Sequence, residues 1–392
     1  MHVSQEAYPI TASSILSPLG CGVESHRHHF RNGITGLQPT DSGSPVSTFL
    51  GVVDTHLPDL PPSLTRHQTR ATRMAALLFE EIRPQVKAAL DRWGPSRIGV
   101  FLGSCNAGTA GTENALQCHL GGKPFPANFD FHNQHHFYGI LHVVRSLSGC
   151  TGPGSVISTA CSSSAKVFAT AQRLLNANVI DAAIVGGIDT LCFLTLNGFN
   201  GLGLIAKQMC QPFGQDRDGL NLGEGGALML LERSGEAATS LIAVGESSDA
   251  HHMTSPSPGG AGAIAAIKAA LLRANLRADD IGFIQAHGTS TRSNDAAEGA
   301  AILDVFSTQT TVVATKSYTG HLLGACGGIE AAFTSLSLEE GWLPDSLLKG
   351  EVDPKAPVHL TRHFQDFSGT YAVSNSFGFG GSNISLVLGR SK

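Results

Sequence analysis

Charged residues are scarce in this sequence of 392 residues. Asp, Glu, Lys and Arg make up 15% of the chain, against about 25% in an average globular protein. Basic residues are outnumbered by acidic ones, and the formal net charge is −5. Because such a chain lacks the overall positive field that nucleic-acid binding needs, nucleic acid is not expected as a partner. An acidic partner would have to meet a local basic patch.

Two further absences limit the class of protein. No stretch approaches the roughly 18 consecutive apolar residues of a membrane-spanning helix, and the first residues lack the basic and apolar segments of a secretory leader. The 8 cysteines are irregularly spaced and no two form a C-x-x-C pair, which argues against a zinc or disulfide framework. Reduced thiols are the simpler interpretation. We therefore expect a soluble, cytoplasmic protein without a membrane span.

Glycine and apolar residues are abundant instead. The chain has 46 glycines and 42% apolar residues, which is enough for a large core with many tight turns. A strand, a polar turn and an alanine-rich helix are predicted in residues 156–187, and the same order returns in residues 312–340. This repeat predicts an α/β protein of two similar halves, which we place at residues 1–235 and 236–392.

One predicted strand-to-helix turn carries a candidate nucleophile. Val156 and Ile157 end a short apolar run, Cys161 follows, and helical apolar spacing begins at Ala165. A cysteine in this place lies at the positive end of a helix dipole, which favours the thiolate. A buried structural cysteine fits this stretch equally well when it is taken alone.

Several chemistry-bearing residues further along the chain also stand directly after predicted strands. They are His287, after residues 281–285; Lys316 and His321, after residues 311–315; and the glycine loop 378–381. In an α/β sheet, ligands meet the loops at the carboxyl ends of the strands. We therefore expect these residues to converge on Cys161, and this favours the nucleophile over the structural thiol.

The predicted set of side chains suits acyl-transfer chemistry. A thiolate forms and releases thioesters readily, and two histidines can place two N–H donors on one developing oxyanion. Glu330 could pair with Lys316 and hold it in place, and residues 378–381 can present backbone N–H groups to an oxyanion. The alternative is that His287 and His321 are hydrogen-bonded core histidines.

Two groups of histidines raise the question of a metal. The i, i+2, i+3 spacing of His26, His28 and His29 gives a poor shared helix face, so we expect them on a solvated helix surface. A second group contains His132, His135, His136 and His142, of which 132 and 136 form an i, i+4 pair, but no third well-placed ligand lies nearby except Asp130. The sequence therefore predicts no metal site.

Five motifs resemble those of the β-ketoacyl-acyl-carrier-protein synthases, the ketosynthases of the thiolase-fold condensing-enzyme superfamily. They are Thr159-Ala-Cys161-Ser-Ser-Ser, Asp216-Arg-Asp-Gly-Leu-Asn-Leu-Gly-Glu-Gly, Ala286-His287-Gly-Thr-Ser-Thr, Lys316-Ser-Tyr-Thr-Gly-His321-Leu-Leu-Gly-Ala and Asn375-Ser-Phe-Gly-Phe-Gly-Gly-Ser-Asn383. They stand in family order and cover most of the chain. The resemblance implies a thiolase-like five-layered α-β-α-β-α fold of two similar halves, usually dimeric.

The resemblance also implies a reaction, the decarboxylative Claisen condensation of malonyl-carrier protein with an acyl chain on Cys161. The catalytic residues it implies are Cys161, His287, His321, Lys316, Glu330 and Phe379, the last as an oxyanion-hole N–H and a gate. The substrate and phosphopantetheine contacts it implies are Thr289, Thr291, Phe377, Gly378, Gly380 and Gly381. Acyl carrier protein is the implied partner, and no metal or other cofactor is required.

Some positions depart from the family pattern. Ser162 and Ser163 follow the cysteine, as in many polyketide members, and Arg292 stands where proline is common. These departures leave open a fatty-acid or a dedicated polyketide or aryl-polyene pathway, and a homodimer or a heterodimer with a sister subunit. Two other classes are also weighed. A non-catalytic chain-length factor would lack Cys161, and a thiolase acting on coenzyme A esters would need a second cysteine near the C-terminus.

Overall fold

The first half of the chain builds a mixed sheet. The computed structural model describes residues 6–40 and 46–391, and it places five strands of this half in the order β6-β5-β7-β9-β1. They are β1 (Tyr8–Ser17), β5 (Ile98–Gly103), β6 (Gly154–Ile157), β7 (Ala182–Asp189) and β9 (Gly225–Glu232). β5 runs parallel to β6 and β7, whereas β9 pairs antiparallel with β7 and β1. β5 and β7 are buried throughout, which explains their continuous apolar sequences.

The second half repeats this arrangement in the order β12-β11-β16-β17-β10. Its strands are β10 (Thr239–Ser248), β11 (Ile281–Gln285), β12 (Thr311–Val313), β16 (Tyr371–Gly378) and β17 (Ser382–Arg390). β11 runs parallel to β12 and β16, and β17 pairs antiparallel with β16 and β10. The strand order and directions therefore match those of the first half. A short pairing of β1 with β10, at Tyr8 and Pro9, joins the two sheets.

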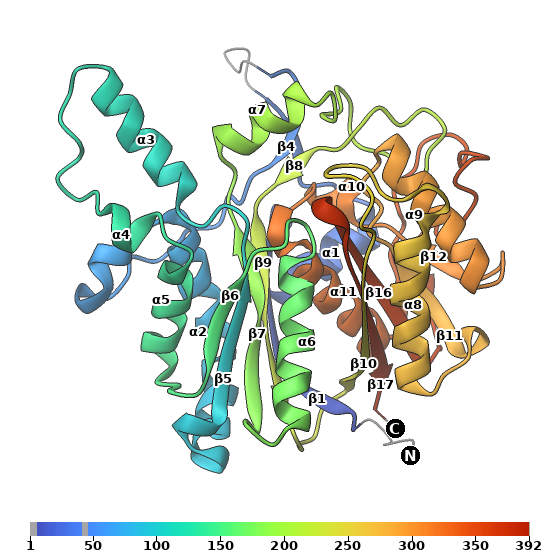
Figure 1. Ribbon diagram of the computed structural model, residues 1–392, viewed down its shortest axis with the longest axis horizontal. Helices are drawn as coiled ribbons and strands as arrows, with labels where there is room; N and C mark the ends of the chain where they lie inside the picture. Colours follow the sequence, from blue (N-terminus) through green and yellow to red (C-terminus); the bar gives the residue numbers. More distant parts are fainter. Residues whose placement is uncertain (1–5, 41–45, 392) are drawn as a thin grey trace.

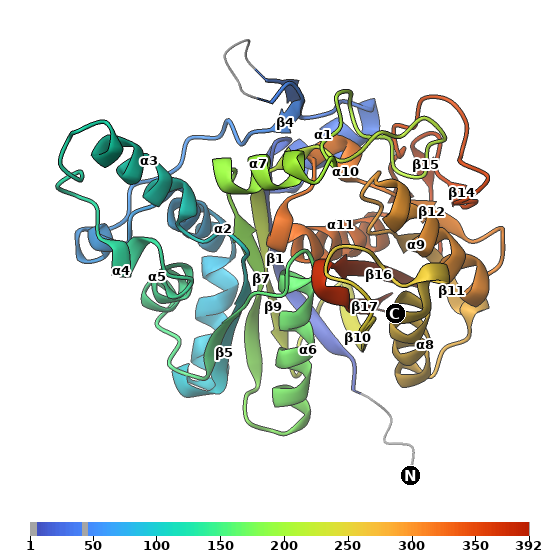
Figure 2. The same cartoon turned by 45° about the horizontal axis from the view of Figure 1, so that its top comes forward.

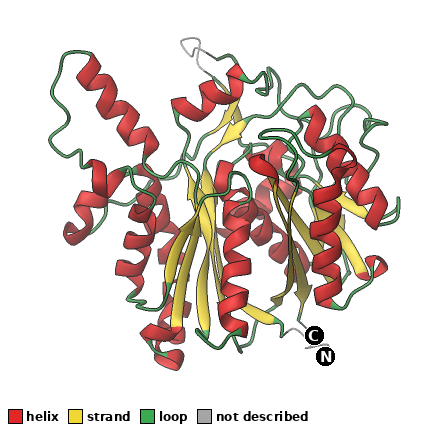
Figure 3. Cartoon of the chain, in the orientation of Figure 1, coloured by secondary structure: helices red, strands yellow, loops and turns green. Residues whose placement is uncertain are grey.

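Two central helices separate the sheets (Figure 1). α6 (Ser163–Asn176) and α11 (Cys326–Glu340) lie between them. The outer helices are α2 (Arg70–Trp93) and α5 (Tyr138–Ser148) on the first sheet, and α8 (Ala261–Ala274) and α9 (Arg292–Val305) on the second. α11 is buried from Cys326 to Leu338, as a helix of small and apolar residues allows. Figure 3 shows the resulting α-β-α-β-α layers, so the expected thiolase-like fold is confirmed.

A helical lobe extends away from the first sheet, and both cartoon views show it apart from the layers (Figure 2). It comprises α3 (Thr109–Leu120), α4 (Phe131–Gln134) and the loop that joins them. Apolar side chains are exposed on it, including Leu116, Leu120, Phe125 and Phe131. His132 on α4 and His136, which follows α4, are exposed, and no group of three potential metal ligands in the described ranges includes them.

Short elements complete the described chain. They are α1 (Gly22–Asn32), α7 (Phe193–Gly201), α10 (Lys316–Thr319), β2 (Gly20–Cys21), β3 (Leu37–Pro39), β4 (Phe49–Gly51), β8 (Leu222–Gly223), β13 (Trp342–Leu343), β14 (His359–Leu360), β15 (Gln365–Asp366) and the 3₁₀ turns Pro62–His67, Pro95–Arg97, Pro258–Gly260, Ala278–Asp280, Leu323–Ala325 and Phe379–Gly381. Among the helices of residues 6–40 and 46–391, none combines the length and the apolarity that crossing a bilayer requires.

The prediction of a solvated surface is wrong for His26, although His28 is exposed as predicted. His26 lies one turn before Phe30, and both face the core. Its Nε2 lies 2.7 Å from Ser17 Oγ and its Nδ1 lies 2.7 Å from the Gly22 carbonyl oxygen. Burial lowers the pKa of His26 to about 4, so the ring is a neutral core group with both nitrogens satisfied.

Candidate active site

Cys161 stands at the sharp turn between β6 and α6. Ala160, which precedes it, has a φ of +52°, in the left-handed region that few residues other than glycine adopt. Ser163 holds this turn: its Oγ donates to the Ala160 carbonyl oxygen at 2.5 Å and accepts from the Thr159 N–H at 2.9 Å. The strained turn presents the cysteine ahead of the α6 N-terminus, as a nucleophile elbow does.

Burial raises the pKa of the Cys161 thiol to about 11. The Lys316 ammonium and the backbone N–H groups of Phe379 and of Cys161 itself act in the opposite direction. The helix N-terminus therefore favours the thiolate, as the sequence predicts, but it does not make the thiolate the resting form. The residue is only 6% exposed, and the loss of hydration outweighs the dipole.

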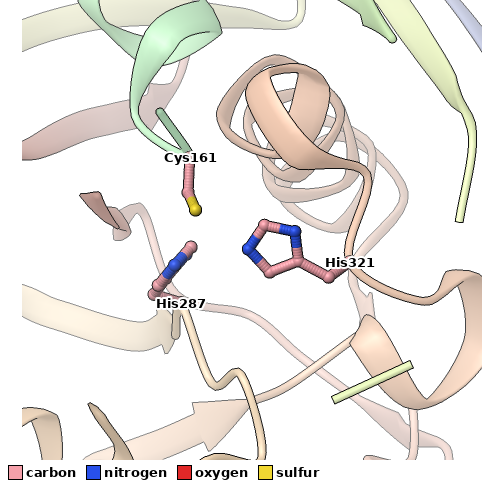
Figure 4. A group of neighbouring side chains, drawn as sticks. All are labelled: Cys161, His287 and His321. Carbon is pink, nitrogen blue, oxygen red and sulfur yellow. The ribbon is translucent and has the colours of Figure 1, made fainter. Parts of the chain in front are cut away.

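Two histidines meet Cys161 at the carboxyl ends of the strands (Figure 4). His287 follows β11, and His321 follows α10. One Sγ or ring nitrogen atom from each of the three residues lies within 4.8 Å of the others. The two imidazole rings stand almost perpendicular, at 78°, with their centroids 5.7 Å apart. The structure thus brings together the three side chains that the sequence separates widely.

Neighbouring donors fix the proton on each imidazole. The Leu323 N–H donates to His321 Nδ1 at 3.0 Å, and Lys316 Nζ lies 3.3 Å from His287 Nδ1. Because both Nδ1 atoms accept, both Nε2 atoms carry the proton. Burial lowers the pKa of His321 to about 3, and it lowers the pKa of His287 well below the usual value. Both rings are therefore neutral, and each offers one N–H.

The same tautomers argue against a metal ion bound by Cys161, His287 and His321. A metal-ligating histidine usually donates its other N–H to an acceptor. Here the second nitrogen of each ring faces a donor, the Leu323 amide or the Lys316 ammonium. That ammonium also adds positive charge beside the three ligand atoms. The donor set does not fit a divalent cation.

A buried ion pair lies behind His287. Lys316 Nζ donates to Glu330 Oε1 and to the His287 carbonyl oxygen, and both charged side chains are 2% exposed. Burial favours the neutral lysine, but the surrounding groups, Glu330 foremost, together outweigh it and the pKa of Lys316 rises. Neither residue lines the pocket described below, so the pair supports His287 and does not touch a substrate there.

Sequence reasoning does not single out Glu298, which holds the backbone of His287. Its carboxylate accepts the N–H groups of His287 and Gly288, each at 2.8 Å, and it lies 3.4 Å from Asn375 Nδ2. Burial raises the pKa of Glu298 to about 7. The available signal was a pair of carboxylates, Asp295 and Glu298, on the core-facing side of α9 among small residues such as Ala297 and Ala301.

A pocket with about 560 Å³ of empty space, its open mouth included, leads to this site. Its walls contain Cys161, His287, His321 and Phe379. They also contain all six residues expected at the phosphopantetheine arm, which are Thr289, Thr291, Phe377, Gly378, Gly380 and Gly381. The Thr289 and Thr291 hydroxyls lie 2.9 Å apart, and the Phe379 ring packs on Phe199 with centroids 5.6 Å apart.

A second loop at the pocket mouth, also missed by sequence reasoning, is tied to the glycine loop 378–381. The Asp249 N–H donates to the Gly381 carbonyl oxygen at 2.9 Å, and the Gly380 N–H donates to that of Met253 at 2.7 Å. Asp249 and His252 line the pocket. Movement of either loop would therefore disturb the other.

Comparisons with known proteins cover nearly the whole chain. The family model described as "Beta-ketoacyl synthase, N-terminal domain" matches residues 22–237, and "Beta-ketoacyl synthase, C-terminal domain" matches residues 239–348. The chain is 30% identical to a 3-oxoacyl-(acyl-carrier-protein) synthase 2 of Vibrio cholerae serotype O1, over 99% of this chain and 100% of that protein. It is 29% identical to the protein of the same name from Staphylococcus aureus, over 97% and 100%.

Solved structures show the same similarity. A ketosynthase, ApeO, in complex with its chain length factor, ApeC, from Xenorhabdus doucetiae has a TM-score of 0.93 and 34% identity, and the match covers 100% of both chains. A beta-ketoacyl synthase from Burkholderia phymatum STM815 has a TM-score of 0.89 and 26% identity, over 99% of this chain and 100% of that one.

Proposed function

We propose, from the premise that the chain belongs to the β-ketoacyl synthase family, that Cys161, His287 and His321 perform its condensing reaction. The protein is a 3-oxoacyl-acyl-carrier-protein synthase, an acyltransferase that condenses malonyl-carrier protein with an enzyme-bound acyl chain in fatty-acid or polyketide elongation. The observation that best supports the residue assignment is the meeting of one thiol with two neutral imidazoles inside one pocket.

The first step transfers an acyl chain to Cys161. Its Sγ forms a bond to the acyl carbonyl carbon, the thioester bond to the carrier breaks, and the thiol proton ends on the departing pantetheine sulfur. The backbone N–H groups of Cys161 and Phe379 are directed at this sulfur, so they are placed to donate to the oxyanion that forms beside it. The Lys316 ammonium lowers the free energy of the transient thiolate.

The second step forms the carbon–carbon bond. Malonyl-carrier protein loses CO₂, and the electron pair of the broken bond becomes an enolate whose oxygen accepts the Nε2–H groups of His287 and His321. The enolate carbon attacks the Cys161 thioester carbonyl, the carbon–sulfur bond breaks, and the sulfur takes up a proton. Lys316 and Glu330 keep the His287 tautomer that this step needs.

The remaining pocket residues bind and admit the substrate arm. Thr289 and Thr291 receive the phosphopantetheine arm, together with Phe377, Gly378, Gly380 and Gly381. Phe379 acts as the gate, a role supported by its position in the pocket wall against Phe199. Opening the gate would separate these two rings.

The partners we infer are an acyl carrier protein and a second ketosynthase-like chain. The support for a sister subunit is the similarity to ApeO, which is solved with its chain length factor; a homodimer is the alternative.

The division into residues 1–235 and 236–392 is supported by the repeated strand order and by the junction of the two family models. A cytoplasmic location is supported by eight free cysteines.

Separate assays of the two steps test the assignment. Cys161→Ala should give no acyl-enzyme by intact-protein mass spectrometry, whereas Cys118→Ala, in the lobe, should acylate normally. His287→Ala and His321→Ala should retain acylation but lose condensation about 100-fold or more, since each removes one oxyanion donor. The assignment would be contradicted if the Cys161→Ala variant were acylated, or if the histidine variants lost acylation and condensation equally. Condensation with acetyl-coenzyme A in preference to malonyl-carrier protein would favour a thiolase.

A further inference from the structure

Asp189 is a buried carboxylate that the reaction above does not use. It ends β7, and its side chain is fully buried at 0% exposure. In the second half of the molecule the corresponding strand, β16, ends at Gly378, where the glycine loop begins. Asp189 therefore occupies the same functional edge of its sheet, the edge at which loops carry chemistry.

Hydrogen-bond donors from two separate loops converge on Asp189. After β5, the Ser104 hydroxyl donates to Oδ1 at 2.6 Å, and the Cys105 and Asn106 N–H groups donate at 2.8 Å. From the turn after His321, the Gly324 N–H donates to Oδ2 at 2.7 Å. The carboxylate thus ties the loop beside Cys161 to the turn that follows His321.

The turn after His321 is strained. Leu323 has a φ of +52°, and a single residue other than glycine in this region costs about 1 kcal/mol or more. Two consecutive amides of this turn are bound: the Leu323 N–H by His321 Nδ1 at 3.0 Å, and the Gly324 N–H by Asp189. The bond to Asp189 therefore helps keep Leu323 in the conformation that presents its N–H to the imidazole.

We propose that Asp189 is a positioning residue for His321, which it keeps protonated on Nε2 by holding the Leu323 turn. The inference rests on the proposed role of His321 in decarboxylation. When the carboxylate is lost, Leu323 relaxes, its N–H leaves Nδ1, and the imidazole proton moves between the two nitrogens. A proton on Nδ1 leaves no donor toward the enolate. Acylation of Cys161, which does not use His321, continues.

Asp189→Asn is the direct test. The amide is similar in size, but its NH₂ group would oppose the N–H donors that the carboxylate accepts. We expect acylation within about 3-fold of wild type and condensation lowered about 10-fold or more through kcat. In ¹⁵N-histidine-labelled protein, with His321→Ala to assign the signal, His321 should change from the Nε2–H tautomer to a mixture. Ser104→Ala, which removes a donor to the same carboxylate but leaves the turn untouched, should preserve both rates and the tautomer.

Gly324→Ala perturbs the same contact from the other side. Its Cβ would lie 2.8 Å from Asp189 Oδ2 and equally close to the Cys105 backbone nitrogen and Sγ. It should therefore displace the carboxylate together with Cys105, and we expect a loss of condensation with acylation retained. The positioning role would be overturned if the His321 tautomer stayed unchanged in Asp189→Asn, or if acylation and condensation fell equally. It would also be overturned if Ser104→Ala had the same effect, or if neither Asp189→Asn nor Gly324→Ala folded. If the His321→Ala variant condensed normally, the proposed function itself would be overturned. If the His321→Ala variant lost condensation while the Asp189→Asn variant kept it, only the present inference would be overturned.

Discussion

The three side chains that meet in the pocket are neutral at rest because each is almost fully buried. Cys161 keeps its proton, with a pKa of about 11, and His321, with a pKa of about 3, stays uncharged at neutral pH. The mechanism that we propose creates two anions in turn, a thiolate and an enolate. Each forms where N–H donors are already in place, so the protein does not reorganise to meet the charge.

The raised pKa of Cys161 predicts how fast the thiol is alkylated. The rate with iodoacetamide, followed on the Cys161 peptide by mass spectrometry, should rise about tenfold per pH unit from pH 7 to 9.5, because the thiolate fraction grows over that whole range. N-acetylcysteine, as the control thiol, should begin to level off near the top of the range. A Cys161 rate that is constant above pH 8 would show that the resting group is a thiolate.

The lowered pKa of His26 predicts a loss of stability in acid. The unfolded chain binds a proton below about pH 6.5, while the folded ring, with a pKa of about 4, stays neutral. Stability contributed by the neutral ring is therefore lost as pH falls from 6.5 to 4, by about 3 kcal/mol in total. Urea unfolding of wild type and His26→Gln should diverge over this range, with wild type losing more. Parallel pH profiles would contradict the assignment.

At the scale of elements, the two central helices hold equivalent parts of the site. Cys161 lies in the turn before α6, and His321 lies in the turn before α11, the corresponding helix of the second half. Both turns contain a strained residue other than glycine, Ala160 and Leu323. The distance between thiol and imidazole therefore depends on how closely α6 and α11 pack.

Gly327 allows α11 to pack closely against α6, and Gly327→Ala tests whether the site needs this close packing. A Cβ at Gly327 would lie 2.6 Å from the Ala165 Cβ and 2.9 Å from the Ala165 backbone nitrogen. We expect the added methyl to cost about 1–3 kcal/mol, to lower the thermal midpoint, and to reduce condensation at least tenfold as the helices part. Gly111→Ala in α3 has open space around its Cβ and should do neither. Unchanged activity in Gly327→Ala would show that the helices can separate without disturbing the site.

At the scale of the whole molecule, the exposed lobe and the free edge of β6 stand on the same half. β6 ends the strand order and is partly exposed along its length. Leu120 on the lobe is 77% exposed, and Phe131 is 50% exposed. An outer strand edge and a group of exposed apolar side chains are each typical of an interface with another chain, and both support the second ketosynthase-like subunit that we propose.

Leu120→Asp tests the lobe as part of that interface. In sedimentation velocity a homodimer would run at about twice the 40.9 kDa chain mass, and Leu120→Asp should then shift it toward the monomer, because a buried carboxylate is costly. Leu272→Asp is the matched control, since Leu272 on α8 is 74% exposed. Equal behaviour of the two variants would exclude the lobe. A monomeric wild type would contradict the homodimer and make co-purification with a sister chain the next measurement.

The sequence by itself determined the features that depend on local pattern. Apolar runs and helical spacing predicted the strands and helices, their repetition predicted two similar halves, and the motifs around Cys161, His287 and His321 predicted the family. Those residues were identified because each follows a strand, and the carboxyl ends of parallel strands share one edge.

Only the tertiary structure decided the protonation states and the supporting contacts. These are the protonated thiol of Cys161, the burial of His26, the hydrogen bonds of Glu298 to the His287 backbone, and the link from Asp189 to the turn after His321. The physical reason is that burial and hydrogen bonding act through space. A strand-to-helix turn predicts where a side chain stands, but the elements packed around it decide which atom carries the proton.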